Sequence, residues 1–180
     1  MKVLIPIVIG LLVVGCASTP TNPNCVSDPS DPNNVKIEAA IRSRLGKPEG
    51  ELTKADLEKV TELGIYNKQL TSVKGLEKLT QLEVLSLRNN KLTDVKGLEK
   101  LTKLEELYLS DNKLTNVKGL EKLTKLGELD LGYNKLTDVT GLEKLTKLTR
   151  LTLSNNPDLT KAQIDELQKA LPNCRIHSNP

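Results

Sequence analysis

The feature that most constrains this chain is a unit of 22 residues that returns with little change from Val60 onward. The second copy reads LEVLSLRNNKLTDVKGLEKLTK and the third reads LEELYLSDNKLTNVKGLEKLTK. A period of this length predicts a solenoid, because each unit buries its apolar face only by stacking on a neighbour. The copies occupy residues 60–81, 82–103, 104–125 and 126–147, and a fifth, incomplete copy runs from 148 to 159.

The leucines and asparagines of each copy follow the pattern L-x-x-L-x-L-x-x-N-x-L, as in Leu82, Leu85, Leu87, Asn90 and Leu92. Over residues 60–159 this pattern resembles the leucine-rich repeat family, in particular the 22-residue type of internalin-like bacterial surface proteins. The resemblance implies an α/β fold, a right-handed solenoid with a parallel sheet on its concave face and short helical or 3-10 segments on the return side.

Each position of the unit has a predicted task. Leu82 to Leu87 is expected to form a short strand, with Leu85 and Leu87 pointing inward. The glycine of each copy, such as Gly97, allows a sharp turn on the return side. A stack of asparagines should satisfy backbone groups where each strand ends, and Lys68 in the first copy weakens that stack. The asparagines are Asn90, Asn112, Asn134 and Asn156.

Both ends of the solenoid need caps, because the terminal leucine layers would otherwise face water. Residues 35–59 predict an amphipathic helix over 35–45, followed by a short helix that Thr53 caps and that runs to about Val60. Residues 160–180 predict a capped helix over 161–171 and one last strand, with Cys174 pointing inward.

The chain begins like an exported protein. Lys2 precedes the apolar stretch Val3–Val14, which spans roughly 18 Å as a helix and is too short to cross a bilayer. Residues 1–15 therefore predict a signal peptide. Their end resembles a bacterial lipobox, which implies lipidation of Cys16; the alternative is an ordinary signal peptide followed by an incidental cysteine. Residues 16–34, rich in Pro, Asn and Ser, predict a disordered tether.

If Cys16 is lipidated, the chain is anchored to a bacterial membrane. By resemblance to lipoprotein sorting, Ala17 favours the outer membrane where the host has one. Cys25 and Cys174 can form a disulfide in an exported protein, but they flank opposite ends of the solenoid, which favours two separate thiols.

Composition excludes several classes of function. The formal net charge is +3, too small for the basic stripe that nucleic-acid binding requires. The chain has three cysteines and one histidine, His177, which is expected in an exposed tail. These numbers leave little material for a metal site or a nucleophile, so no cofactor and no enzymatic activity are expected.

Differences between the copies are concentrated in the predicted strands, whereas the return-side residues are nearly identical, including exposed Lys and Glu. All three aromatic residues lie in the varying positions. Tyr and Arg are enriched at binding hot spots, so we predict a ligand-binding surface there. The alternative is that Tyr simply favours strands and that copying made the rest uniform. The candidate residues are Tyr66, Tyr108, Tyr133, Arg88, Arg150, Glu62, Glu106, Glu128, Asp130 and Asp111.

Three kinds of function remain open at this point. The first is a monomeric binding module with a protein partner or, as a second choice, an envelope glycan. The second is a structural envelope lipoprotein that acts through its tether and end-to-end packing. The third is an enzyme or cation site built on Glu106, Glu128 and Asp130, although a solvated acidic patch explains those residues more simply.

Overall fold

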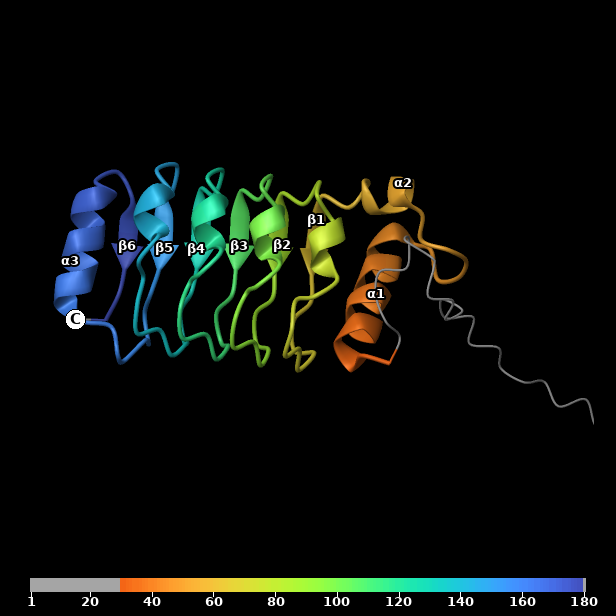
Figure 1. Ribbon diagram of the computed structural model, residues 1–180, viewed down its shortest axis with the longest axis horizontal. Helices are drawn as coiled ribbons and strands as arrows, with labels where there is room; N and C mark the ends of the chain where they lie inside the picture. Colours follow the sequence, from red (N-terminus) through yellow and green to blue (C-terminus); the bar gives the residue numbers. More distant parts are fainter. Residues whose placement is uncertain (1–29, 180) are drawn as a thin grey trace, which may run out of the picture.

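A computed structural model of the chain describes residues 30–179. Six parallel strands form one open sheet in chain order, and Figure 1 shows them side by side. The predicted parallel solenoid is confirmed, although the strand of the second copy is shorter than the predicted Leu82–Leu87. The strands are β1 (Glu62–Gly64), β2 (Val84–Ser86), β3 (Glu106–Tyr108), β4 (Glu128–Asp130), β5 (Arg150–Thr152) and β6 (Arg175–His177). The return segments are 3-10 turns: η1 (Leu76–Lys78), η2 (Leu98–Lys100), η3 (Leu120–Lys122) and η4 (Leu142–Lys144).

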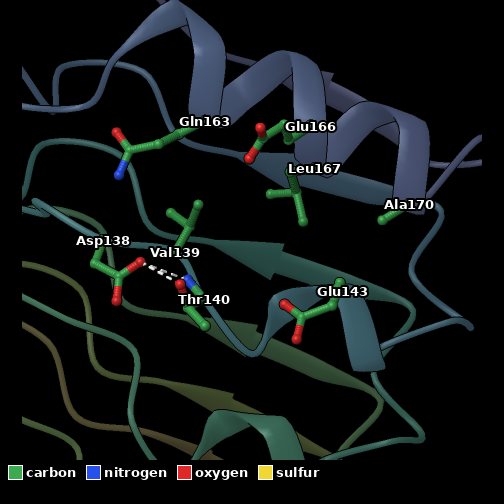
Figure 2. A pocket seen from close by; sticks show the side chains of 8 residues that line it. All are labelled: Asp138, Val139, Thr140, Glu143, Gln163, Glu166, Leu167 and Ala170. Carbon is green, nitrogen blue, oxygen red and sulfur yellow. Dashed lines mark hydrogen bonds between the residues drawn. The ribbon is translucent and has the colours of Figure 1, made fainter.

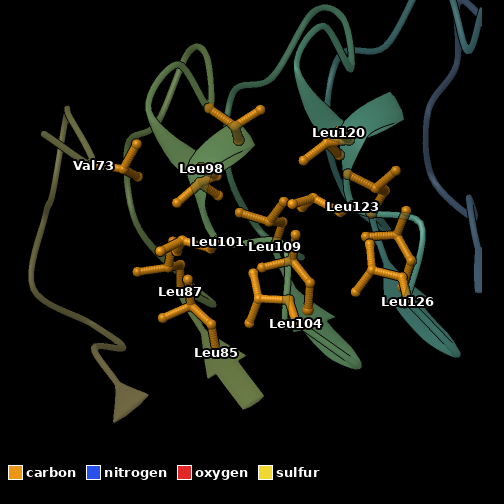
Figure 3. Close-up of a cluster of buried hydrophobic side chains, with 14 of the residues drawn as sticks. Val73, Leu85, Leu87, Leu98, Leu101, Leu104, Leu109, Leu120, Leu123 and Leu126 are labelled. Atoms are coloured by element: carbon orange, nitrogen blue, oxygen red, sulfur yellow. The ribbon is translucent and has the colours of Figure 1, made fainter. Parts of the chain in front are cut away.

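The core is a stack of leucine layers between the strands and the 3-10 turns. In one layer Leu85 and Leu87 approach Leu98 and Leu101 from the opposite side (Figure 3), and all four are fully buried. The strand register places Leu107 directly beside Leu85, so each layer repeats the packing of the previous one. Identical packing layer after layer explains how a chain without Phe or Trp closes a continuous core.

The asparagine stack forms as predicted. In the third copy, Asn112 Oδ1 accepts a hydrogen bond from the Leu92 backbone N–H at 3.0 Å. Asn112 Nδ2 donates to the carbonyl oxygens of Leu87 and Leu109, both at 3.0 Å. Each such amide therefore joins two neighbouring repeats through backbone groups that are buried. The same arrangement recurs at Asn90, Asn134 and Asn156.

Lys68 occupies the asparagine slot of the first copy, but the turn there is held from both sides. Asn90 Oδ1 accepts from the backbone N–H groups of Lys68 and Leu70, at 3.2 and 3.0 Å. From the N-terminal side, Asn33 Oδ1 accepts from the Thr71 N–H at 2.9 Å. The cap therefore supplies one of the contacts that a further repeat would have made.

The return turns have a second recurring hydrogen bond. Gly119 has a φ of 98°, which strongly favours glycine, and its N–H donates to the Glu121 carboxylate at 2.6 Å. The same bond joins Gly97 to Glu99. Hydrogen bonds from the Glu99 and Gly97 backbone N–H groups lower the pKa of the Glu99 carboxyl. The repeated Glu thus closes its own turn, and in three of the four copies it is half-buried, although it was predicted to be exposed. The other two pairs are Gly75–Glu77 and Gly141–Glu143.

The N-terminal cap begins earlier than predicted. Helix α1 (Pro32–Leu45) starts three residues before residue 35, so the predicted tether boundary at residue 34 is wrong. Asp31 is the N-cap, accepting from the Asn33 N–H at 2.8 Å, and proline suits the first helical position. Helix α2 (Lys54–Leu57) has the predicted capping box but ends before Val60.

The C-terminal cap follows its prediction more closely. Helix α3 (Lys161–Ala170) starts at the predicted capping box, and β6 is the expected last strand. Cys174 is buried, as predicted, but it lies one residue before β6. The inward-facing residue of β6 is Ile176, which pairs with Leu151. Burial raises the pKa of the Cys174 thiol. The predicted signal peptide, Cys16 and Cys25 lie outside the described residues.

Candidate functional site

The side chains of the strands that point away from the leucine core form what we call the outer sheet face. Pairing of the strands places these side chains in two columns that run across the sheet. The first column is Glu62, Val84, Glu106, Glu128, Arg150 and Arg175. The second column is Gly64, Ser86, Tyr108, Asp130, Thr152 and His177.

Arg88, Tyr108 and Asp130 form a cluster at the centre of the outer sheet face. Arg88 follows β2, and its guanidinium carbon lies 4.3 Å from the centroid of the Tyr108 ring in β3. The same guanidinium reaches Asp130 in β4, with 3.0 Å between Nη2 and Oδ2. Arg88 thus spans three strands, and the stacking and the ion pair together hold its planar group in one place.

Tyr108 also contacts the first column. Its hydroxyl donates to Glu106 Oε2 at 2.6 Å. Burial raises the pKa of Tyr108 to about 12, and the hydrogen bond to Glu106 and the charge of Glu128 add to this effect. Tyr108 therefore stays protonated at neutral pH and remains a hydrogen-bond donor to Glu106.

The acidic residues considered as a catalytic or cation site are engaged by neighbouring groups. Asp130 is held by Arg88, and its second oxygen accepts from the Gly132 N–H at 3.1 Å. Glu128 lies 3.4 Å from an Arg150 nitrogen. Among residues 30–179, no group of three or more His, Cys, Asp or Glu side chains has an arrangement that fits a metal ion. These side chains form a polar surface on the sheet.

The caps add residues at the ends of the two columns that were not among the predicted site residues. Glu62 is paired with Arg44 of α1 at 2.9 Å, so the cap contributes to this surface. At the other end β6 adds Arg175 beside Arg150, and His177 beside Thr152. His177 is exposed, as predicted, but it belongs to the sheet, so its prediction as a tail residue is wrong. The apolar match of Ile176 with Leu151 is the sequence signal that would have revealed this register.

Tyr66 and Tyr133 lie at the ends of their strands, three strands apart, and they are the most exposed large hydrophobic residues in the described part of the chain, at 59% each. The Tyr66 ring lies over Gly64, since a Cβ there would come within 3.0 Å of it. The three tyrosines thus do not form one cluster, and only Tyr108 is in the central group.

Tyr133 has a strained backbone. Its φ is 54°, in the left-handed region, where a bulky side chain is disfavoured. The equivalent positions in the other copies have the same conformation but hold Asn or Asp, which tolerate it better. A large exposed aromatic residue at such a position is not explained by folding. These positions are Asn67, Asn89, Asp111 and Asn155.

Replacing Tyr133 with Asn should therefore raise the free energy of unfolding by about 1 kcal/mol, since it relieves this strain without removing buried contacts. Urea unfolding of both proteins measures the change. Tyr133→Phe is the matched control and should give no gain, because Phe is equally strained. Equal stability of the Asn variant and the original protein would show that the position is unstrained.

A separate groove of about 290 Å³ lies between the last return turn and α3 (Figure 2). Val139 and Leu167 face each other across it, and Glu143 and Glu166 stand at its rim. Gln163 bridges the two sides by donating to the Thr137 carbonyl at 3.0 Å. The groove is thus the seam along which the C-terminal cap packs on the last repeat.

Comparisons with known proteins agree with this architecture. The family model described as leucine rich repeats (2 copies) matches residues 58–100, 102–144 and 126–169. The chain resembles the crystal structure of an internalin, InlF of Listeria monocytogenes, with 31% sequence identity and a TM-score of 0.74. The match covers 81% of this chain but 44% of that one, so this chain spans less than half the length of that internalin.

A second internalin structure, internalin C2 of the same organism, is 24% identical over 83% of this chain and 89% of that one, with a TM-score of 0.41. No sequence among the curated proteins matches the chain. No helix within residues 30–179 has the length and apolar character needed to cross a membrane.

Proposed function

The chain belongs to the leucine-rich repeat family, and from this we propose that it is a binding module that holds a protein partner on its outer sheet face, the face predicted to be concave. The observation that carries the proposal is the placement of the differences between repeats. Return-side Glu and the asparagines are uniform because each makes a recurring backbone hydrogen bond. The varied, exposed side chains are on the outer sheet face.

The character of that face supports a protein partner. The face has a stacked arginine and carboxylates, and two exposed tyrosines lie just beyond its strands β1 and β4. These residue types make directional contacts in protein interfaces. The strain at Tyr133 adds support, since an exposed residue that lowers stability is best explained by a contact outside the chain. An envelope glycan, which can also stack on tyrosines, is the second candidate.

The test is a variant in which Tyr66, Tyr108 and Tyr133 are all replaced with Ala. We expect it to lose protein partners that the original chain captures from envelope extracts, because each truncation at a hot spot reduces affinity by about tenfold or more. Quantitative mass spectrometry of the captured proteins measures the loss. A variant with Lys113, Lys125 and Lys147 replaced with Ala, all on exposed return-side positions, is the control and should capture the same proteins. Equal capture by both variants would contradict the proposal.

We further propose that the module is exported, monomeric and lipid-anchored through Cys16, in the outer membrane if the host has one. The lipobox-like residues before Cys16 support the anchor. The packing of α1 against β1 supports a monomer, because it covers one edge of the sheet.

Mass spectrometry of the protein from its host should find a lipid on Cys16, and Cys16→Ala should move the protein from the membrane to the soluble fraction. The matched control is Cys25→Ala, which should remain in the membrane. An unmodified Cys16 would overturn the anchor and leave the binding module intact.

A further inference from the structure

We propose that the partner lies on the outer sheet face in one orientation, with a basic side chain over Glu106 and Glu128 and an acidic side chain over Arg150 and Arg175. The inference rests on the proposed function, and it specifies the chemistry of the protein partner.

The order of charges along the first column carries the inference. From β3 to β6 this column contains two acids followed by two bases, each on the strand next to the previous one. Neighbouring strands are about 4.8 Å apart, so Glu106 and Glu128 repel each other, as do Arg150 and Arg175. The 3.4 Å contact of Glu128 with Arg150 offsets these repulsions in part, whereas an opposite charge placed over each pair relieves both.

These four charges are available to a partner. Arg175 and Glu106 have no ion-pair partner within residues 30–179, and Glu106 accepts only the Tyr108 hydroxyl. The contact of Glu128 with Arg150 is 3.4 Å long and largely exposed, a geometry that contributes little. By contrast, the other two acids of the face have shorter contacts within the chain, Glu62 with Arg44 at 2.9 Å and Asp130 with Arg88 at 3.0 Å.

The distance between the acidic pair and the basic pair limits which partner segments can contact both. The centres of the two pairs are two strand spacings apart, roughly 10 Å. The neutral cluster of Arg88, Tyr108 and Asp130 lies beside the acidic pair and provides a firm surface without net charge. A segment with one basic and one acidic side chain about 10 Å apart therefore satisfies both pairs in one direction only, and the reversed segment meets like charges at both ends.

The probe is a library of random peptides displayed on phage and selected on the full-length chain. We expect the selected peptides to contain a Lys or Arg together with an Asp or Glu. Two variants locate their contacts: Glu106→Gln with Glu128→Gln, and Arg150→Gln with Arg175→Gln. Each should weaken a selected peptide by about tenfold, as for loss of one interfacial charge pair. The control is Glu49→Gln with Glu166→Gln, which changes the net charge as the Glu106/Glu128 variant does, but at exposed positions away from the face, and should leave binding unchanged.

Double-mutant cycles then assign each end. Replacing the basic residue of the peptide should not weaken its binding to the Glu106/Glu128 variant any further, but should weaken its binding to the Arg150/Arg175 variant by the full amount. Replacing the acidic residue should weaken binding to the Glu106/Glu128 variant by the full amount and leave binding to the Arg150/Arg175 variant unchanged. Thermal unfolding of every variant verifies that the isosteric Gln residues leave the fold intact.

Peptides that bind through the tyrosines but show no such coupling would overturn the orientation and leave the proposed function standing. Failure to select any peptide, or binding that ignores every substitution on the outer sheet face, would overturn both.

Discussion

Replacing Asn112 with Ala should lower the free energy of unfolding by about 3 kcal/mol. The Asn112 side chain makes hydrogen bonds with the Leu92 N–H and with the carbonyl oxygens of Leu87 and Leu109. Removing the amide leaves the Leu92 N–H buried without this partner, which costs roughly 1–3 kcal/mol. It also takes one of two side-chain hydrogen bonds from each carbonyl, about 0.5–1.5 kcal/mol apiece, because Asn90 still donates to Leu87 and Asn134 still donates to Leu109. Denaturant unfolding followed by circular dichroism measures the change.

The control for this substitution is Asn116→Ala. Asn116 is half-buried on the return side of the same repeat and accepts only the Lys118 N–H, at 3.2 Å. Its amide also donates to Thr115 Oγ1 at 3.3 Å. Loss of the side chain should lower stability by less than about 1 kcal/mol, because water can replace both of these exposed bonds. If the two variants lose the same stability, the asparagine stack contributes no more than an exposed turn does.

Replacing Leu107 with Ala should lower the free energy of unfolding by about 3 kcal/mol or more. Leu107 is fully buried in β3, between the layers of Leu85 and Leu129. The cavity left by Leu→Ala cannot collapse easily, because the layers on both sides are fixed by the same packing. Losses of 2–5 kcal/mol are typical of such sites.

Leu107→Met is the matched control. It keeps the apolar volume nearly unchanged and should lower stability by less than about 1.5 kcal/mol. Both variants are compared with the original chain by urea unfolding. A small loss for Leu107→Ala would mean that neighbouring layers move together to fill the space, so that each layer is not a rigid unit.

Most of the fold could be predicted from the sequence, because each packing contact occurs once in every copy of the repeat. Leu85, Leu87 and Asn90 recur at fixed spacing in the copies, and a residue type that recurs at the same place in a stacked unit has the same environment each time. The strand order, the buried leucines and the asparagine bonds were all predictable for this reason.

The parts that were predicted wrongly lie where the repeat stops. Pro32 is typical of a disordered tether, so its segment was assigned to one. In the structure Asp31 caps a helix that starts at Pro32, and the hydrogen bonds between Asn33 and Thr71 fix this helix to the first repeat. His177 follows a helix with no repeat to align it, so its place in the sheet depended on the pairing of Ile176 with Leu151.

The candidate site was predictable as a set of positions but not as a set of contacts. Sequence comparison of the copies selects the varying residues, including Arg88 and Asp130. It does not show that Arg88 crosses Tyr108 to reach a strand two repeats away, because the direction of a long side chain depends on its neighbours. A comparison of repeats also cannot predict the ion pair of Arg44 with Glu62, because Arg44 lies in the N-terminal cap, outside the repeats.

Because the return side is uniform, the length of the solenoid can change in steps of one repeat. Each unit presents the same backbone groups to the unit before and after it, so one unit can be inserted or lost between the caps without a new interface. Such an event lengthens or shortens the sheet by about 4.8 Å and moves the basic end of the first column away from, or toward, the acidic end by that amount. Duplication of one repeat within this chain would therefore change the reach of its partner-binding face in discrete steps. Each added unit would also add its own packing to the stability, while the caps stay as they are.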